Sequence, residues 1–490
     1  MPRLLLSVLI AGFLGTGLVF LFWPFRGWLK VDLWIKLSLS VALGYGISSC
    51  VFFVWLMAFG APGIGFMLTE GALAILLVAA LFYRFRHSPP SRSLELPTQS
   101  QQKLKFSRLL SLLFYAGAIS ALVTSISMLI RSPDGHYDAI AIWNMRARFI
   151  FRGGTRWTDA FSSILSWSHP DYPLLLPLSV ARGWSYVGYE TLFVPGTIAI
   201  TFMLATIIML VSSLSVLRSK TQGYLAGLVF LAPALVIRTG SSEYADIPLG
   251  FFMLATIILF YLQDTTQEGN SAFLILAGLT AGFAAWTKNE GLLFLVSIVI
   301  ARFVIFPFAH GLGRLWIEQL LFFLLGLIPI LLILVYFKFK LAPANELVAS
   351  RDFQSTLKQL LTLSRYTTIL AALKKEMLVF GGWIVNPIYL LIMYPICVGV
   401  RLEVKNRLPT ATAIVAISLV SSGYFFVYVT TPHDLNWHLE SSLNRLLLQL
   451  WPTFVFIYFM IARTPEEALL GSELEASPER ENPSELASVG

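Results

Sequence analysis

Long apolar runs alternate with short polar segments along most of the chain. Runs near 20 residues predict membrane-spanning helices, because each helix must cross about 30 Å of hydrocarbon. The pattern predicts about thirteen such helices, at roughly 5–23, 36–57, 66–83, 109–130, 191–216, 222–238, 247–262, 271–286, 291–308, 316–337, 379–400, 410–430 and 444–462. The chain is therefore predicted to be an all-α polytopic membrane protein.

The composition agrees with this pattern. Of 490 residues, 57% are hydrophobic and 13% are charged, whereas soluble domains have about 45–50% and about 25%. The net charge of +8 is spread over many short loops, so a nucleic-acid partner is not expected. Cys50 and Cys397 lie far apart in apolar runs and predict neither a disulfide framework nor a thiol motif.

The orientation follows from Lys and Arg in the short loops. With an outer amino terminus, seventeen basic residues fall in inner segments and four in short outer segments. Two long segments, 131–190 and 338–378, then face the exterior. Both interleave basic and apolar residues, so we expect juxtamembrane amphipathic helices in them.

The spans and the composition divide the chain into four predicted parts. Residues 1–83 form an amino-terminal module of three membrane helices. Residues 84–108 form an inner linker rich in Ser, Gln and Pro. Residues 109–462 form the main transmembrane domain with both outer loops. Residues 463–490 are polar and acidic and predict a disordered inner tail.

The predicted outer side collects titratable side chains. Seven of nine aspartates and four of six histidines fall there. Acidic residues contribute little to orientation, so topology does not force them outward. Loops at one end of a rigid helix bundle are a common place for a functional site. For any one of these residues, a solvated surface is the alternative.

The first outer loop carries several candidates. Residues 137–151 predict a helix along the membrane interface, from which Arg148 can reach a phosphate. Asp138 lies near the start of this helix, where a carboxylate either caps the helix or takes part in chemistry. Prolines then fix an extended path near His169 and Asp171, which either contact a substrate or hydrogen-bond the loop to itself.

Two short turns add further candidates. Glu243 and Asp246 are three residues apart and would share a face if their turn is helical. A helix cap is the alternative for Asp246. In the next turn, Lys288 either offers a point charge to a phosphate or reaches to the membrane interface, with Glu290 beside it.

The segment before the last span places His438 and Arg445 on one stripe of a helix, with Arg445 available to a phosphate. The spacing of its histidines matches no strong zinc signature. No Walker motif, nucleophile elbow or dinucleotide fingerprint is found. We therefore predict no metal site and no cofactor, and a requirement for a divalent metal is left open.

Together these clusters resemble the GT-C superfamily of polytopic glycosyltransferases, in particular the protein-mannosyltransferase-like (family 39) and Rgt-type lipopolysaccharide sugar transferases. The similar pieces, which follow the family by order and topology over about residues 109–462, are 137–144, 243–248, 287–288 and 438–445. The resemblance implies transfer of a sugar from a polyprenyl-phosphate carrier to a glycolipid, polysaccharide or protein. It implies a bacterial plasma (inner) membrane with the active face outside.

The resemblance also implies roles for single residues. The family's catalytic acid corresponds to Asp138 or Asp134, and Asp138 is favoured because a juxtamembrane helix follows it. Many members carry an Asp-Glu or Asp-x-Asp pair in this loop, and this chain does not. Asp138 would be the general base of an inverting transfer. The remaining candidates would bind phosphate, sugar or acceptor: Arg148, His169, Asp171, Glu243, Asp246, Lys288, Glu290, His438 and Arg445.

Three other functions are considered. A lipid-linked oligosaccharide ligase or polymerase shares this general design but uses a larger donor. A transporter or flippase would place its site near the midplane, often between paired repeats. No repeat is found, and the charges lie at helix ends, which favours transfer. A non-catalytic scaffold would leave the outward bias of Asp and His unexplained.

Overall fold

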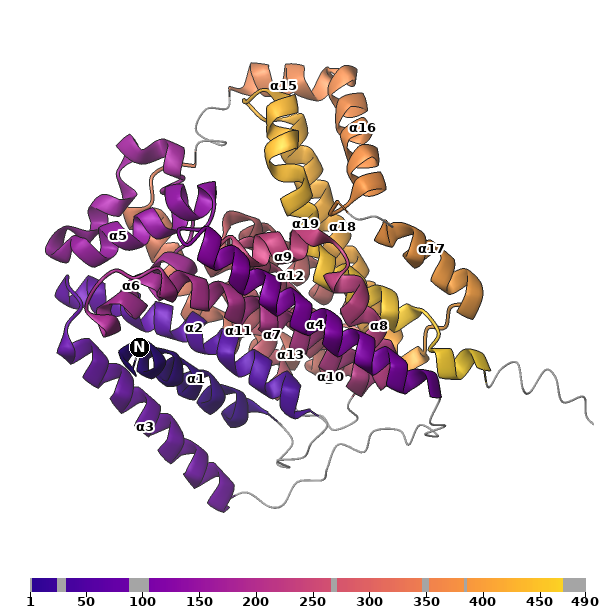
Figure 1. The fold of residues 1–490 in the computed structure, drawn as a ribbon, viewed down its shortest axis with the longest axis horizontal. Helices are drawn as coiled ribbons and strands as arrows, with labels where there is room; N and C mark the ends of the chain where they lie inside the picture. Colours follow the sequence, from indigo (N-terminus) through magenta and orange to yellow (C-terminus); the bar gives the residue numbers. More distant parts are fainter. Residues whose placement is uncertain are drawn as a thin grey trace, which may run out of the picture.

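The computed structural model describes residues 2–23, 32–87, 105–265, 271–345, 352–382 and 386–469. Within these ranges the chain is helical, with no β-strand and one isolated β-bridge between Val400 and Ala462. The fold therefore agrees with the predicted all-α class. Figure 1 shows a bundle of long helices, above which α15 (Phe353–Leu361) and α16 (Leu363–Val379) project.

The first half of the chain begins with three helices and then alternates long helices with loop helices. Its elements are α1 (Pro2–Phe22), α2 (Leu33–Phe59), α3 (Ile64–His87), α4 (Lys105–Arg131), the π-helix η1 (Ala139–Trp143), α5 (Asn144–Arg152), η2 (Gly154–Phe161), η3 (Ser163–Ser168), α6 (Leu175–Val187), α7 (Phe193–Leu217), α8 (Lys220–Leu231) and α9 (Ala234–Ser241).

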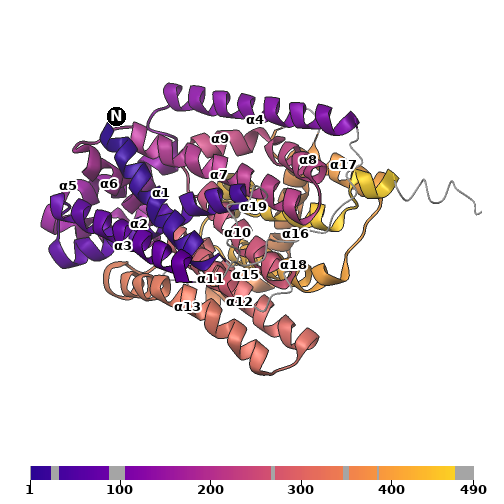
Figure 2. The same cartoon turned by 90° about the horizontal axis from the view of Figure 1, so that it is seen from below.

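The second half contains the helices that enclose the core. Its elements are α10 (Asp246–Thr265), α11 (Ala272–Thr287), α12 (Asn289–His310), α13 (Arg314–Tyr336), the π-helix η4 (Phe337–Leu341), α15, α16, α17 (Pro387–Val398), η5 (Val404–Asn406), α18 (Arg407–Val429) and α19 (Leu435–Ile461). Figure 2 shows α4 along one face of the bundle and α13 on the opposite face.

Among the described residues, ten helices are long and apolar enough to cross a membrane, namely α1, α2, α3, α4, α7, α10, α12, α13, α18 and α19. The pair α8 and α9 passes the same test together, with a bend of 72°, which would make eleven. Two shorter apolar helices, α11 and α17, remain. Twelve of the thirteen predicted segments correspond to one of these helices or to the bent pair, whereas 379–400 contains the shorter α17 and residues outside the described ranges. How many cross a membrane stays a prediction.

The bend between α8 and α9 lies at Pro233, which precedes α9. Proline lacks a backbone N–H and restricts the residue before it, so a continuous helix is disfavoured there. At the centre of the bundle, 94% of the most apolar part of α10 is buried. Helix α10 packs against α7, α11, α18 and α19. Its first residue, Asp246, is therefore held at a fixed place in the core.

The amino-terminal helices share this core. Helix α2 packs against α6 and α7, and α1 packs against α6. In the buried interior, Arg182 on α6 donates to the Glu70 carboxylate on α3, with an N–O distance of 2.9 Å. The tertiary contacts of helices α1 to α3 thus reach well beyond residue 83, the predicted module boundary.

Parts of the predicted linker and tail lie outside the described residues, namely 88–104 and 470–490. The first residues of the tail are described. Glu467 accepts a hydrogen bond from Arg218 at 3.0 Å, and Glu466 accepts one from Ser219 at 3.2 Å. The beginning of the acidic tail is therefore anchored to the end of α7.

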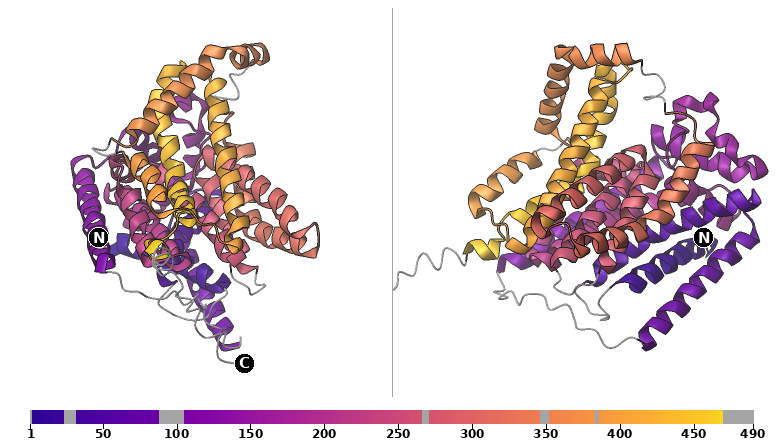
Figure 3. Two further views of the ribbon diagram at one scale, coloured as in Figure 1. Left: turned by 90° about the vertical axis from the view of Figure 1, so that its right-hand side faces the viewer. Right: turned by 180° about the vertical axis from the view of Figure 1, so that it is seen from behind.

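Both long loops contain the expected helices. The predicted helix at 137–151 corresponds to η1 and α5, although the π-helical turn was not anticipated. In the second loop, α15 exposes Phe353, Leu357 and Leu361, which are four residues apart and share a face. Figure 3 shows α15 and α16 standing apart from the bundle at the ends of α18 and α19. Helices are thus found in both segments, and their role as juxtamembrane amphipathic helices stays a prediction.

Candidate functional site

Five charged side chains from four distant segments meet in one network, here called the charge cluster: Asp138, Asp246, Lys288, Glu290 and Arg445. Arg445 Nη2 lies 2.7 Å from Asp138 Oδ2 and 2.9 Å from Asp246 Oδ2. Lys288 Nζ lies 3.2 Å from Asp246 Oδ1 and 2.8 Å from Glu290 Oε1. The structure thus joins the first long loop, two helix turns and α19.

The turn between α11 and α12 places Lys288 in the cluster. Lys288 is extended, with φ −159° and ψ 160°, between the two helices. A Cβ added to Gly291 would lie 1.8 Å from the Ala284 carbonyl oxygen, so glycine permits this close approach of α12 to α11. The Lys288 side chain is buried and ion-paired with Asp246 and Glu290. Its position relative to a membrane interface stays a prediction.

Asp246 is the buried centre of the cluster. Its side chain has no exposed surface and accepts hydrogen bonds from Lys288, Arg445 and Gln449. Gln449 Nε2 donates to Asp246 Oδ1 with an N–O distance of 2.5 Å. All these donors point at one enclosed carboxylate. Asp246 therefore holds the two cations in position, and its carboxylate is not accessible to a sugar. The helix-cap alternative is not observed for this side chain.

The cluster contains two cations and three carboxylates, which gives a net charge of −1 when all are ionised. Burial alone lowers the pKa of the Lys288 ammonium, but Asp246 and Glu290 outweigh burial and raise that pKa above its ordinary value. Lys288 therefore stays charged at neutral pH.

Asp138 does not cap a helix. It precedes η1, but its side chain makes no capping hydrogen bond. Its carboxylate faces Arg445, and both side chains are 17% exposed. The capping alternative is therefore wrong, and Asp138 stands at the accessible edge of the cluster.

Three other candidates, Arg148, Asp134 and Glu243, make their contacts outside the charge cluster. Arg148 pairs with Asp134 at 3.2 Å and with Glu190 at 3.5 Å. Glu243 accepts a hydrogen bond from Asn144 Nδ2 at 2.6 Å. Arg148 and Asp134 therefore make no ion pair with the charge cluster.

Glu243 has a left-handed backbone with φ 61°. The turn is not helical, so the condition under which Glu243 and Asp246 would share a helical face is not met. Burial is the main cause that raises the pKa of Glu243 to about 8, with a smaller contribution in the same direction from Asp134. The Asn144 hydrogen bond and the Arg148 charge oppose this rise. Glu243 is thus a carboxyl group that holds its proton near neutral pH.

Asp171 connects three other segments of the chain through hydrogen bonds. Its Oδ2 accepts hydrogen bonds from Asn289 at 2.8 Å and from Asn345 at 2.7 Å. Lys338 donates to the Asp171 backbone carbonyl at 2.5 Å. Since Asn289 follows Lys288 in the chain, this group supports the charge cluster from one side. These three partners lie in other segments, so Asp171 does not hydrogen-bond its own loop as the alternative stated, and none of the three was anticipated.

Each of the two candidate histidines contacts a residue of a loop. The His169 ring stacks on Tyr172, with a centroid distance of 4.9 Å. A ring nitrogen of His438 lies 2.9 Å from the Thr431 hydroxyl. As predicted, His438 and Arg445 lie on one helix, α19.

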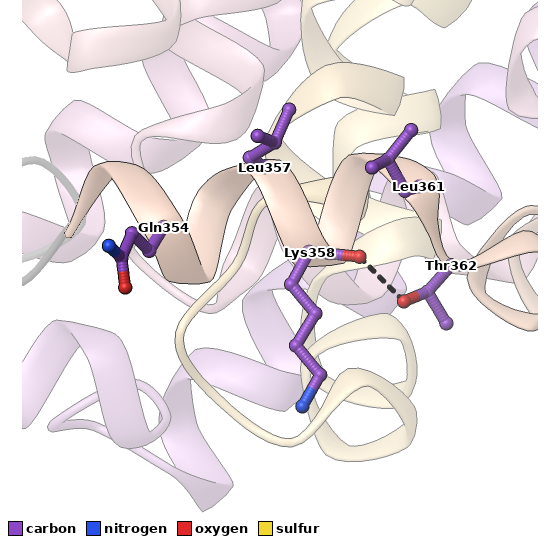
Figure 4. A pocket seen from close by; sticks show the side chains of 5 residues that line it. All are labelled: Gln354, Leu357, Lys358, Leu361 and Thr362. Atoms are coloured by element: carbon purple, nitrogen blue, oxygen red, sulfur yellow. Dashed lines mark hydrogen bonds between the residues drawn. The ribbon is translucent and has the colours of Figure 1, made fainter.

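Two hollows are described, and neither is lined by the charge cluster. A groove of about 380 Å³ lies between α4, α9, α16 and α19, and its lining includes Leu235, Arg238 and Asn444. A shallow hollow of about 430 Å³ runs along α15 (Figure 4). Within the described part of the chain, no group of three or more His, Cys, Asp or Glu side chains is arranged to hold a metal ion.

No family model, curated protein or solved structure matches this chain. Function is therefore inferred from the site alone.

Proposed function

We propose that the protein is an integral-membrane glycosyltransferase that moves a sugar from a polyprenyl-phosphate carrier to an acceptor outside a bacterial plasma membrane. The acceptor is a glycolipid, a glycan or a protein. One observation carries the proposal: Asp138, Lys288 and Arg445, from segments far apart in the chain, belong to a single network. A carboxylate and two cations are thereby held together by ion pairs.

Each group has a chemical task in this reaction. The acceptor hydroxyl attacks the anomeric carbon while the bond from that carbon to the carrier phosphate breaks, which inverts the configuration. Asp138 receives the hydroxyl proton, because a positioned carboxylate can act as general base. Arg445 and Lys288 stabilise the negative charge that develops on the leaving phosphate. Asp246 holds these two cations in position.

The groove beside the cluster supports a lipid-linked donor. Asn444, which lines the groove, is the neighbour of Arg445 in α19. The groove also contains Leu235 and Ile237 of α9 and Met128 of α4. The lining combines these apolar side chains with Arg238 and Glu376, and a groove of this kind suits a hydrocarbon chain that carries a charged group. This arrangement favours a lipid carrier over a soluble sugar nucleotide.

The test is a transfer assay with purified protein, radiolabelled polyprenyl-phosphate sugars and extracted envelope glycolipids. We expect transfer by the wild type and none by Asp138→Asn, because the amide cannot accept the proton. The Asp138→Asn variant should keep its elution profile and its unfolding temperature.

Asp159→Asn is the matched control, since Asp159 lies in the same loop in a surface ion pair with Arg156. It should transfer at the wild-type rate. Full activity in Asp138→Asn would overturn the assignment of the base. No transfer by the wild type across a broad donor panel would overturn the enzyme proposal.

A further inference from the structure

Each cation of the charge cluster has one buried and one accessible carboxylate partner. Asp246 contacts both cations and has no exposed side-chain surface. Asp138 covers Arg445 with a side chain that is 17% exposed, and Glu290 covers Lys288 with one that is 19% exposed. The two cations are therefore held from the inside and covered from the accessible side.

The charge balance limits how an anion can enter. With a net charge of −1, the cluster does not attract a phosphate, so a phosphate has to replace a carboxylate. Asp246 cannot be the one replaced, because its removal from Lys288 and Arg445 would leave a buried charge with no cation beside it. Asp138 and Glu290 are the carboxylates that can turn toward solvent.

We propose that Asp138 and Glu290 occupy the positions that phosphate oxygens of a lipid phosphate take, and that binding of the phosphate displaces Asp138 from Arg445. The inference rests on the proposed function and adds a regulation to the same site. Arg445 releases the carboxylate of the base only when the donor's phosphate has arrived. Acceptor activation is thus tied to donor binding.

The surroundings of Arg445 fit such an exchange. The Tyr244 ring lies 4.5 Å from the guanidinium carbon, and Asp246 Oδ2 accepts a hydrogen bond from Arg445 Nε at 2.9 Å. Both contacts keep the guanidinium in place when Asp138 leaves. Asp138 itself precedes the π-helical turn η1, and such turns occur frequently at functional sites. Arginine also binds phosphate with paired hydrogen bonds, which suits it to the incoming group.

The experiment measures the affinity of the purified full-length protein for farnesyl phosphate, with farnesol as the uncharged comparison. Removing a competing carboxylate should strengthen phosphate binding, so Asp138→Asn should lower the Kd for farnesyl phosphate by about fivefold, which corresponds to about 1 kcal/mol. The control Asp159→Asn should leave that Kd unchanged. Farnesol affinity should be the same in all variants.

An unchanged or raised Kd in Asp138→Asn would overturn the exchange. If that variant does not fold, Glu290→Gln tests the same exchange at Lys288, and its Kd should also fall. An unchanged Kd in Glu290→Gln would then overturn the inference.

The binding assay separates this inference from the proposed function. A lowered Kd in Asp138→Asn together with no transfer by the wild type overturns the glycosyltransferase proposal alone. Normal transfer by the wild type together with an unchanged Kd in Asp138→Asn overturns the exchange alone.

Discussion

Asp246 has the most enclosed carboxylate of the charge cluster, and its removal should be costly. Asp246→Asn would leave Lys288 and Arg445 close together without the charge that separates them. We expect a loss of about 3–5 kcal/mol of stability, as for other broken buried ion pairs. Thermal unfolding in detergent measures the loss, and Asp159→Asn should change the stability by less than about 0.5 kcal/mol. Equal unfolding temperatures for Asp246→Asn and the wild type would contradict this role.

Glu243 gives a prediction about pH. Its folded pKa of about 8 lies above the ordinary value of 4.5. The unfolded chain therefore releases this proton first, and stability is lost as pH rises between about 4.5 and 8. Glu243→Gln removes the ionisable group while keeping its size. As pH rises through this window, the unfolding temperature of the wild type should fall relative to that of Glu243→Gln. A constant difference between the two unfolding temperatures would contradict the raised pKa of Glu243.

Charged residues of the site were predictable, whereas their amide partners were not. Asp138, Lys288 and Arg445 stand out because charge is rare in apolar surroundings and has to gather near water. Gln449 and Asn289 give no such signal in a sequence. The conformation of the turn at Glu243 could not be predicted, because residues other than glycine seldom adopt a positive φ and no local sequence pattern indicates one.

At the scale of elements, helices were predicted well because apolar length is a local property of the chain. Their ends depend on specific contacts. Helix α19 begins at Leu435, before the predicted start at 444, because Asp434 caps it by accepting a hydrogen bond from the Trp437 N–H at 2.8 Å. The π-helical turns depend on packing that the hydrophobic pattern does not record, and the bend follows from Pro233, which lies within one continuous apolar run.

The Arg182–Glu70 pair gives a prediction at this scale, because it joins α6 to α3 in the interior. The Tyr186 hydroxyl also donates to the Glu70 carboxylate, with an O–O distance of 2.7 Å. Glu70→Gln and Arg182→Met should each lower the unfolding temperature, because each leaves a buried charge unpaired. The double variant should be more stable than either single variant. Additive losses in this double-mutant cycle would show that the pair is not coupled.

At the scale of the whole molecule, the charge cluster requires that its four segments lie on one side of the membrane. In a Cys397→Ser background, which removes the exposed native thiol, Tyr137→Cys and Trp437→Cys should react with an impermeant thiol reagent added outside intact cells. Both native side chains are exposed. Val404→Cys, which also replaces an exposed side chain, should react only after the cells are opened. Reaction of the first two positions from opposite sides would contradict the topology.

The distance along the chain between Asp246 and Arg445 has a consequence for biogenesis. Helix α10 emerges from the ribosome long before α19, so the nascent protein carries a carboxylate whose main partner does not yet exist. We therefore expect helix α10 to stay near the translocon or the lipid headgroups until α19 has been synthesised. Chains that stop before residue 435 are then expected to be extracted and degraded, although nine of the ten long apolar helices found among the described residues would already have been made.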